Sequence, residues 1–280
     1  MPPTRAPTAP RSAGDRVRGV LVGALCGLAR ALDRGVIAST FVAGGLLRLD
    51  ALGDHTAENW RHFGLGQTEA DIAAGLFEWE TTFYGRFLRP GDRVLLVGCG
   101  SGRDLVALLA QGHRVEGLEP VDACAALARA RVARQGLTAE IHVADINTAP
   151  PPGTFDVVIF SWFCYSYIPL RARRIAVLGT VREHLAPGGR ILISYALGAP
   201  APRRLPWRLA RLAAQISRND WRPEYGDVFL ARHDTGRIHF EHRFQPDEIE
   251  REARRAGLAV AFHEYPSDGN LALVVPETPA

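Results

Sequence analysis

The stretch VLLVGCGSGRD, Val94 to Asp104, decides the fold. It opens with branched apolar residues up to Val97, a run typical of a strand that is buried on both faces. Three glycines follow at alternate positions, namely Gly98, Gly100 and Gly102. A helix is expected to begin at Arg103, and its free N–H groups favour an anionic ligand group. Because glycines let a backbone approach a ligand closely, the stretch predicts a binding loop at a strand end.

Outward from this stretch, apolar runs that suit strands alternate with helical patterns. Strands are expected at 94–97, 114–119, 139–143, 155–160, 190–195, 258–263 and 271–275. Helices are expected at 17–32, 69–88, 103–111, 122–134, 171–185, 205–216 and 247–256. Such alternation with short connections predicts an α/β fold, a doubly wound and mainly parallel sheet with helices on both faces.

The remaining segments suggest how the chain is divided. Residues 1–16 are rich in Pro and are expected to form a disordered tail. Residues 17–68 are expected to form an N-terminal helical segment, with a second apolar piece from Val36 to Leu49. The main domain would then span 69–280. Within it, residues 198–246 form an unusually long connection with its own helix and hairpin, which predicts an inserted lid.

Composition excludes several function classes. All 33 basic residues are Arg, so a phosphate-binding loop of the Walker type and a Schiff-base enzyme, which both need Lys, are excluded. A net charge of +3 is too small to indicate a nucleic-acid partner. The four Cys show no CxxC spacing, so no metal site is expected, and free thiols favour a cytoplasmic location.

Spacing discriminates between ligands. A dinucleotide loop needs its third small residue at position 103, which is Arg here, so a pyrophosphate ligand is disfavoured. Glu119 ends the next expected strand, 21 residues after Gly98, where a carboxylate can accept hydrogen bonds from both hydroxyls of a ribose. Asp145 follows the third strand and could accept from an adenine amino group, with Ile146 packing on the ring.

With these motifs the chain resembles the class I S-adenosylmethionine-dependent methyltransferases from about residue 69 to 276. VLLVGCGSGRD, VEGLEP, VADI, FDVVIFSW and HLAPGGRILIS resemble successive motifs of that family. The resemblance implies an enzyme, a seven-stranded sheet in the order 3-2-1-4-5-7-6 with strand seven antiparallel, and S-adenosyl-L-methionine as cofactor. The cofactor-binding residues it implies are Gly98, Cys99, Gly100, Gly102, Glu119, Pro120, Asp145, Ile146, Ser161 and Trp162.

The acceptor must be inferred from what would face the cofactor. The segment SWFCYSYIP after the fourth strand is aromatic and uncharged, which suits a small molecule. The Asp/Asn-Pro-Pro-aromatic signature usual for nucleic-acid or glutamine substrates is absent. We therefore expect in-line transfer of a methyl group to an O or N atom of a small-molecule acceptor. Candidate acceptor contacts are Tyr84, Tyr165, Tyr167 and His239, and candidates for a base are His239, His242 and Tyr165.

Two other functions stay open at this point. Residues 1–49 hold seven Arg and two Asp around the apolar run 19–29, which would suit a peripheral membrane contact. Further Arg residues lie in the insertion: Arg203, Arg204, Arg208 and Arg211. These features favour a membrane-associated methyltransferase of a lipid or quinone. The third function is a cofactor-binding protein without catalysis, against which the intact glycine loop argues.

Overall fold

The computed structural model describes residues 13–199, 204–265 and 268–276 of the 280. Its strands are β1 (Arg93–Val97), β2 (Arg114–Glu119), β3 (Ile141–Val143), β4 (Phe155–Phe160), β5 (Leu185–Tyr195), β6 (Asp227–Arg232), β7 (Arg237–His242), β8 (Ala259–Glu264) and β9 (Gly269–Val274). Its helices are α1 (Ala13–Leu46), α2 (Leu49–Gly66), α3 (Glu69–Ala74), α4 (Glu78–Phe87), α5 (Arg103–Ala110), α6 (Asp122–Arg134), α7 (Arg171–Glu183), α8 (Arg204–Ile216) and α9 (Pro246–Arg255), with a 3-10 turn η1 (Cys164–Tyr167).

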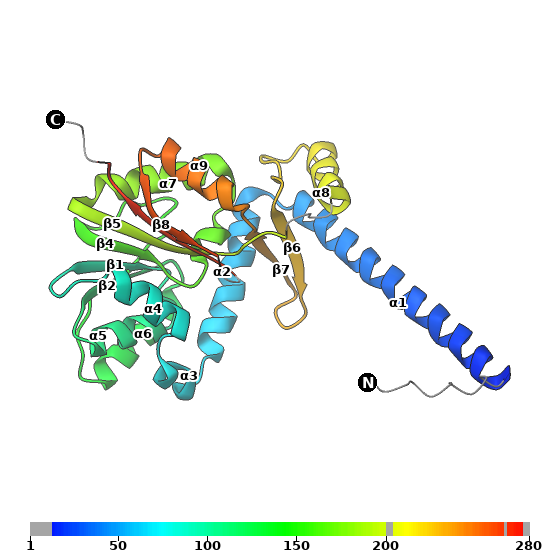
Figure 1. Cartoon of the computed structure of the whole chain (residues 1–280), viewed down its shortest axis with the longest axis horizontal. Coiled ribbons are helices and arrows are strands. Elements are labelled where there is room, and N and C mark those ends of the chain that lie inside the picture. Colours follow the sequence, from blue (N-terminus) through cyan, green and yellow to red (C-terminus); the bar gives the residue numbers. More distant parts are fainter. Residues whose placement is uncertain (1–12, 200–203, 266–267, 277–280) are drawn as a thin grey trace, which may run out of the picture.

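Seven strands form one sheet in the order β3-β2-β1-β4-β5-β9-β8 (Figure 1). Strands β1 to β5 pair in parallel, and β9 runs antiparallel to both β5 and β8. Counted without the separate β6–β7 hairpin, this is the order 3-2-1-4-5-7-6, so the expected fold is confirmed. The chain reverses its direction of travel across the sheet between β1 and β4, where open α/β sheets bind their ligands.

The two faces of the sheet have separate cores, because successive side chains of a strand point to opposite faces. On one face Leu95 and Val97 pack with residues of α7 and α9. On the other face Val94 and Leu96 pack with residues of α4, α5 and α6. All four side chains are buried, as expected for a strand without a solvent face.

A third core lies outside the sheet and joins the N-terminal helices to the insertion. It contains Phe41 of α1 and Leu52 of α2, packed with side chains of α8 and the β6–β7 hairpin. The hairpin and α8 thus fold against α1 and α2, whereas most of α1 extends away from the body of the molecule (Figure 1). Among the described residues, no helix combines the length with the apolar character needed to cross a membrane.

The helices differ from expectation at three places. The expected helix 17–32 and the apolar piece 36–49 as far as Leu46 form one continuous helix, since Gly35 costs a helix only about 1 kcal/mol and is tolerated. The expected helix 69–88 is broken into α3 and α4 by Gly75, whose φ of +68° is left-handed. Residues 13–16 already belong to α1, and residues 1–12 and Arg203 lie outside the described part.

Candidate functional site

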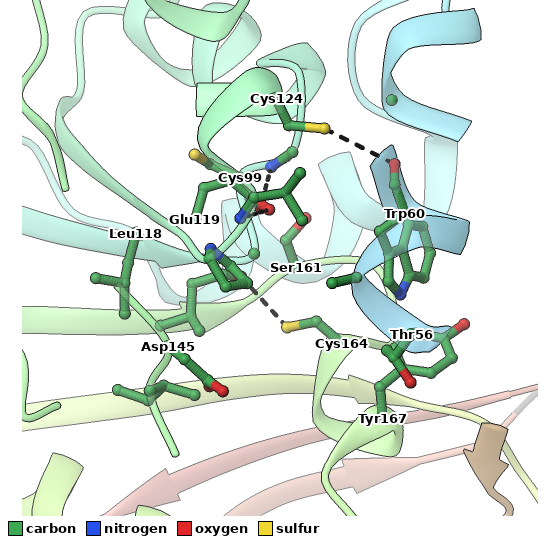
Figure 2. Close-up of a pocket in the computed structure, with 18 of the residues that line it drawn as sticks. Thr56, Trp60, Cys99, Leu118, Glu119, Cys124, Asp145, Ser161, Cys164 and Tyr167 are labelled. Carbon is green, nitrogen blue, oxygen red and sulfur yellow. Dashed lines mark hydrogen bonds between the residues drawn. The ribbon is translucent and has the colours of Figure 1, made fainter. Parts of the chain in front are cut away.

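A pocket opens at the carboxyl ends of β1, β2 and β4, and helix α2 forms its opposite side. Figure 2 shows Glu119 and Asp145 across the pocket from Trp60 and Tyr167. We call the first side the strand-end half, formed by Gly98, Cys99, Gly100, Glu119, Pro120, Asp145, Ile146 and Asn147. All cofactor-binding candidates from the sequence line this pocket, with Gly102 as the exception.

The glycine loop has the backbone that the sequence motif requires. Gly98 and Gly100 have φ values of +73° and +54°, which side-chain-bearing residues rarely adopt. A Cβ added at Gly98 would also lie 3.0 Å from the Cβ of Cys164. Gly102 has a different role, because it caps α5 and an added Cβ would lie 3.2 Å from the Cα of Ala128. It lets α5 and α6 pack closely and lies outside the pocket lining.

Glu119 presents a buried carboxylate to the pocket, and its residue is only 4% exposed. One oxygen accepts from the Gly100 amide and the other from the Val121 amide, each at 2.9 Å. Burial raises the pKa of Glu119 above its ordinary value, and these two hydrogen bonds counteract the rise. Each oxygen keeps a second lone pair, so the carboxylate can still accept from the hydroxyls of a ribose.

Next to it, Asp145 orients a residue that the sequence motif did not single out. One Asp145 oxygen accepts from the backbone N–H of Asn147 at 2.9 Å and from its side-chain Nδ2 at 2.7 Å. This leaves the Asn147 side-chain oxygen buried, and it finds no hydrogen-bond partner within the described residues. A buried acceptor without a partner is costly, and Asn147 is one of the residues that line the pocket.

The opposite side of the pocket is aromatic. We call it the aromatic wall, and its members are Trp60 and Phe63 of α2 with Trp162 and Tyr167 of the segment after β4. The rings of Trp60 and Tyr167 lie 4.9 Å apart between centroids, and those of Phe63 and Trp162 lie 5.1 Å apart. Trp162 itself has a φ of +30°, a strained backbone of the kind that gathers at functional sites.

Helix α2 is held over the pocket from two sides. On the sheet side, the Cys124 thiol donates to the Trp60 carbonyl at 3.7 Å, and Arg131 donates to the carbonyls of Ser101 and Gln67. On the outer side, the Asn59 amide donates to the Ile238 carbonyl at 3.0 Å. Hairpin β6–β7 therefore supports α2 from behind.

A buried charged network lies beneath the pocket and was not anticipated. Arg103 donates to both carboxylate oxygens of Glu80, at 2.9 and 2.6 Å, and pairs with Asp104. Ser161 donates to Asp104 in turn. Burial raises the pKa of Glu80 to about 7 and also raises that of Asp104. Both Arg103 and Asp104 line the pocket, and their place directly after the glycine loop was the available signal.

Several acceptor and base candidates lie elsewhere, which corrects the expectation for them. Tyr84 is buried in the core beneath α5, and the Tyr165 hydroxyl donates to Glu252 on α9 at 3.4 Å. Aromatic side chains near a site in sequence serve the core here because apolar area favours burial. Tyr167 does line the pocket, whereas His239 packs on it from outside, with ring centroids 5.3 Å apart.

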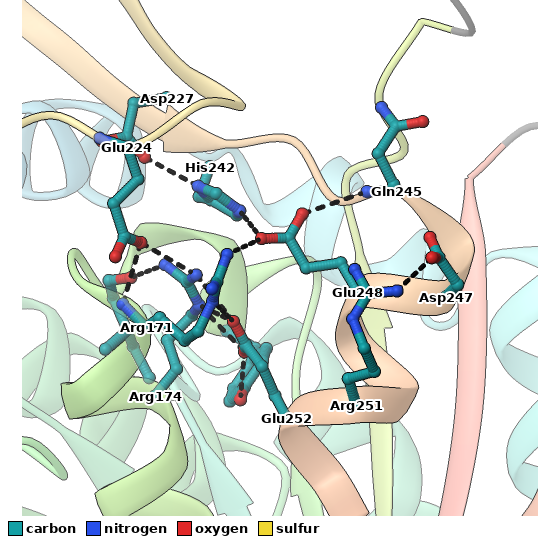
Figure 3. Close-up of polar contacts among 12 residues, drawn as sticks. Arg171, Arg174, Glu224, Asp227, His242, Gln245, Asp247, Glu248, Arg251 and Glu252 are labelled. Atoms are coloured by element: carbon teal, nitrogen blue, oxygen red, sulfur yellow. Dashed lines mark hydrogen bonds and ion pairs between the residues drawn. The ribbon is translucent and has the colours of Figure 1, made fainter.

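His242 belongs to a separate buried network between the hairpin, α7 and α9 (Figure 3). Its Nδ1 donates to Asp227 at 2.7 Å and its Nε2 lies 3.5 Å from Glu248. Burial alone would lower the pKa of His242, but its hydrogen bonds to the two carboxylates raise it overall. His242, Asp227 and Glu224 are close enough to hold a metal ion, yet Arg174 pairs with Glu224 at 3.2 Å and already supplies a cation.

The expected lid is corrected for this pocket only. Within the described part of the insertion 198–246, no residue lines it, whereas Arg232 and Asp234 line an adjoining cavity that shares Phe63 and Trp162 with it. The cover is α2, from the segment that sequence reasoning set apart from the main domain. Its signal was present in the sequence as one helical face: Leu52, Thr56, Trp60 and Phe63 follow each other at spacings of four, four and three.

Comparison with known proteins gives matches at the level of sequence and fold. The family described as "Methyltransferase domain" matches residues 74–262. A protein-L-isoaspartate O-methyltransferase of Methylorubrum populi is 35% identical over 42% of this chain and 50% of its own length. Another, of Methylorubrum extorquens, is 30% identical over 67% of this chain and 72% of its own length. The chain thus spans about half of the first relative and more of the second.

Among solved structures, a S-adenosylmethionine-dependent methyltransferase of Methanosarcina mazei resembles this fold. It is 19% identical, the match covers 71% of this chain and 97% of that protein, and the TM-score is 0.55. At this identity the likeness concerns the fold, that is, the sheet and the helices that cover it.

Proposed function

We propose that this chain, which belongs to the methyltransferase domain family, binds S-adenosylmethionine and transfers its methyl group to a small-molecule acceptor. The strand-end half of the pocket would hold the nucleoside. Glu119 would accept from the ribose hydroxyls, and Asn147, oriented by Asp145, would accept from the adenine amino group. Gly98 and Gly100 leave space for the rest of the cofactor beside the backbone.

The chemistry asks little of the protein beyond alignment. When bound, S-adenosylmethionine supplies a methyl group that its sulfonium already activates. Alignment of two reactants can give an effective concentration of ~10⁵ to 10⁸ M for one reactant at the other. The aromatic wall would hold the acceptor and exclude water from it. Its ring faces also attract a cation, whether on the cofactor or on an amine acceptor.

One observation carries the proposal: a single pocket is polar at the strand ends and aromatic opposite. Trp60 and Phe63 face the same pocket as Glu119 and Asn147. A nucleoside and an apolar acceptor would therefore meet in one enclosed space. An acceptor O–H would need a proton acceptor, whereas a neutral amine would not.

The test is a label-transfer screen on the full chain. S-adenosylmethionine carrying a labelled methyl group is incubated with amines, phenols, carboxylic acids and a peptide containing isoaspartate. We expect micromolar binding of S-adenosylhomocysteine by calorimetry, no comparable binding of NAD, and label in one class of small molecule. Transfer to the peptide alone would overturn the small-molecule acceptor, and absence of cofactor binding would overturn the whole proposal.

A further inference from the structure

Most of helix α1 lies away from the rest of the described protein. Its last turns pack on the body, where Thr40 donates to the Phe229 carbonyl and Gly45 lies against the backbone of α8. Residues 17–36 extend beyond that contact into solvent (Figure 1). A 34-residue helix that packs only by one end needs another partner for its apolar side chains.

Six of these apolar side chains form one stripe, and Val20 and Val22, which are also exposed, lie on either side of it. Val17, Leu21, Leu25, Leu28, Leu32 and Val36 follow one another at spacings of four or three, so they share a face of the helix, and they are 54–65% exposed. Arg30 and Arg34 lie on the opposite face by the same periodicity. The helix is therefore amphipathic, in the manner of helices that lie in a membrane interface.

Helix α8, which packs beside the last turns of α1, is amphipathic as well. Leu205, Leu212 and Ile216 share one face and are 51–74% exposed. Three basic residues border that face, Arg204, Arg208 and Arg211, and the helix sequence contains no acidic residue. Its third face, with Ala210, Ala213 and Ala214, is buried against the protein.

We propose that the stripe of α1 and the exposed face of α8 dock on the surface of an anionic phospholipid bilayer. The charge of the two helices favours an anionic bilayer over a second copy of the chain as the partner. Residues 17–46 and 204–216 together carry six Arg and one Asp. A symmetric dimer would place α8 arginines near their own copies, whereas anionic headgroups attract them. The apolar side chains of both helices would then enter the boundary between headgroups and acyl chains, while the arginines pair with the headgroups.

The docking surface also lies close to the pocket in the chain. Helix α1 ends at Leu46, and Leu49, at the start of α2, already lines the pocket. The α8 side is joined to the same junction, since Asn219 and Trp221 both donate to the Leu47 carbonyl. Docking would thus hold the pocket near the bilayer. The inference concerns binding alone and stands whether or not the acceptor is a lipid.

The test is co-sedimentation of the full chain with vesicles of phosphatidylcholine alone or with 30% phosphatidylglycerol. We expect binding to the anionic vesicles that weakens at least tenfold between 50 mM and 500 mM salt. Two variants probe the surface: Leu21→Gln with Leu25→Gln and Leu28→Gln on α1, and Arg204→Gln with Arg208→Gln and Arg211→Gln on α8. Each should weaken binding about tenfold or more.

Matched controls use exposed residues elsewhere. Leu230→Gln with Val275→Gln removes two apolar side chains that are 42–43% exposed, and Arg251→Gln with Arg254→Gln and Arg255→Gln removes three charges from α9. Both controls should bind within twofold of the wild type, and circular dichroism checks that all variants fold. Equal loss in the controls, equal binding to both vesicle types, or a stable dimer that ignores vesicles would overturn the proposal.

Discussion

The two halves of the pocket are built in different ways. The strand-end half comes from loops that directly follow β1, β2 and β3, so each of its residues lies within a few positions of a strand. In the aromatic wall, Trp162 and Tyr167 also follow a strand, β4, but the other members come from α2. Helix α2 precedes the sheet in the chain and reaches the pocket by packing between α6 and the β6–β7 hairpin. The first half is therefore set by local motifs, whereas the α2 side of the second is set by tertiary contacts.

This difference assigns separate tasks to the halves. Changes at the strand ends should affect binding of the methyl donor, and changes in α2 should affect the acceptor. Changes in the hairpin should act more weakly, because it touches α2 and stays outside the pocket lining as far as the structure describes it.

The largest effect is expected at Glu119. Glu119→Ala removes a buried carboxylate that can bind ribose hydroxyls, a loss of about 1.5–3 kcal/mol. Affinity for S-adenosylhomocysteine should fall ~10- to 150-fold by calorimetry. The control is Glu116→Ala on the same strand, where the side chain pairs with Arg93 instead. Equal affinities of the two folded variants would remove Glu119 from the cofactor site.

The next largest effect is expected at Trp60, in the aromatic wall. Trp60→Ala should lower kcat/KM for the acceptor about tenfold, since it deletes the ring packed on Tyr167, while donor affinity stays within threefold. Trp60→Phe keeps an aromatic ring and should recover most of the rate. If Trp60→Ala instead weakened donor binding and spared the acceptor, the assignment of the halves would be reversed.

A smaller effect is expected from Asn59, the buried contact between α2 and the hairpin. Asn59→Ala leaves the Ile238 carbonyl and the Thr235 hydroxyl without their partner, at a cost of about 1–3 kcal/mol in unfolding free energy. Denaturant titration should show this loss, with the acceptor KM raised about threefold and donor affinity unchanged. Glu58→Ala, one position earlier and with a side chain that is 42% exposed, is the control. A stable variant with an unaltered KM would show that the hairpin does not position α2.

The smallest effect is expected from pH, and it concerns the stability of the fold. Hydrogen bonds to Asp227 and Glu248 outweigh burial and raise the pKa of His242 above its unfolded value of about 6.5. Its stabilisation is therefore fully present below that value and is lost as pH rises through the folded pKa. Thermal unfolding from pH 6 to 9 should show a steeper decline for the wild type than for His242→Gln. Parallel curves would mean that the pKa of His242 is the same in the folded and the unfolded protein, which would contradict the assigned hydrogen bonding.

Sequence reasoning succeeded where structure is local. The glycine loop, Glu119 and Asp145 lie at strand ends, and a buried strand can be recognised from five or six residues. It failed where a side chain has more than one apolar environment available. Tyr165 follows the same strand as Tyr167, yet it turns into the core and reaches Glu252, 87 residues away. Such partners depend on the packing of α9, which no nearby motif encodes.

Sequence reasoning did not identify α2 as the cover of the pocket for the same reason. The insertion 198–246 was expected to close the site, whereas the N-terminal segment 17–68 was set apart from the main domain. An added Cβ at Gly64 of α2 would lie 2.6 Å from the Cys124 sulfur, so the glycine lets α2 approach α6 this closely without a shift of that side chain. One glycine within a helix carries little signal by itself.

The most direct test is a crystal structure of the full chain with bound S-adenosylhomocysteine. The account predicts its ribose hydroxyls on Glu119, its adenine amino group at the side-chain oxygen of Asn147, and the rings of Trp60 and Tyr167 facing its sulfur across the pocket. A ligand bound elsewhere, or a sulfur facing His239 and the hairpin with α2 displaced, would contradict the division of the pocket into a strand-end half and an aromatic wall.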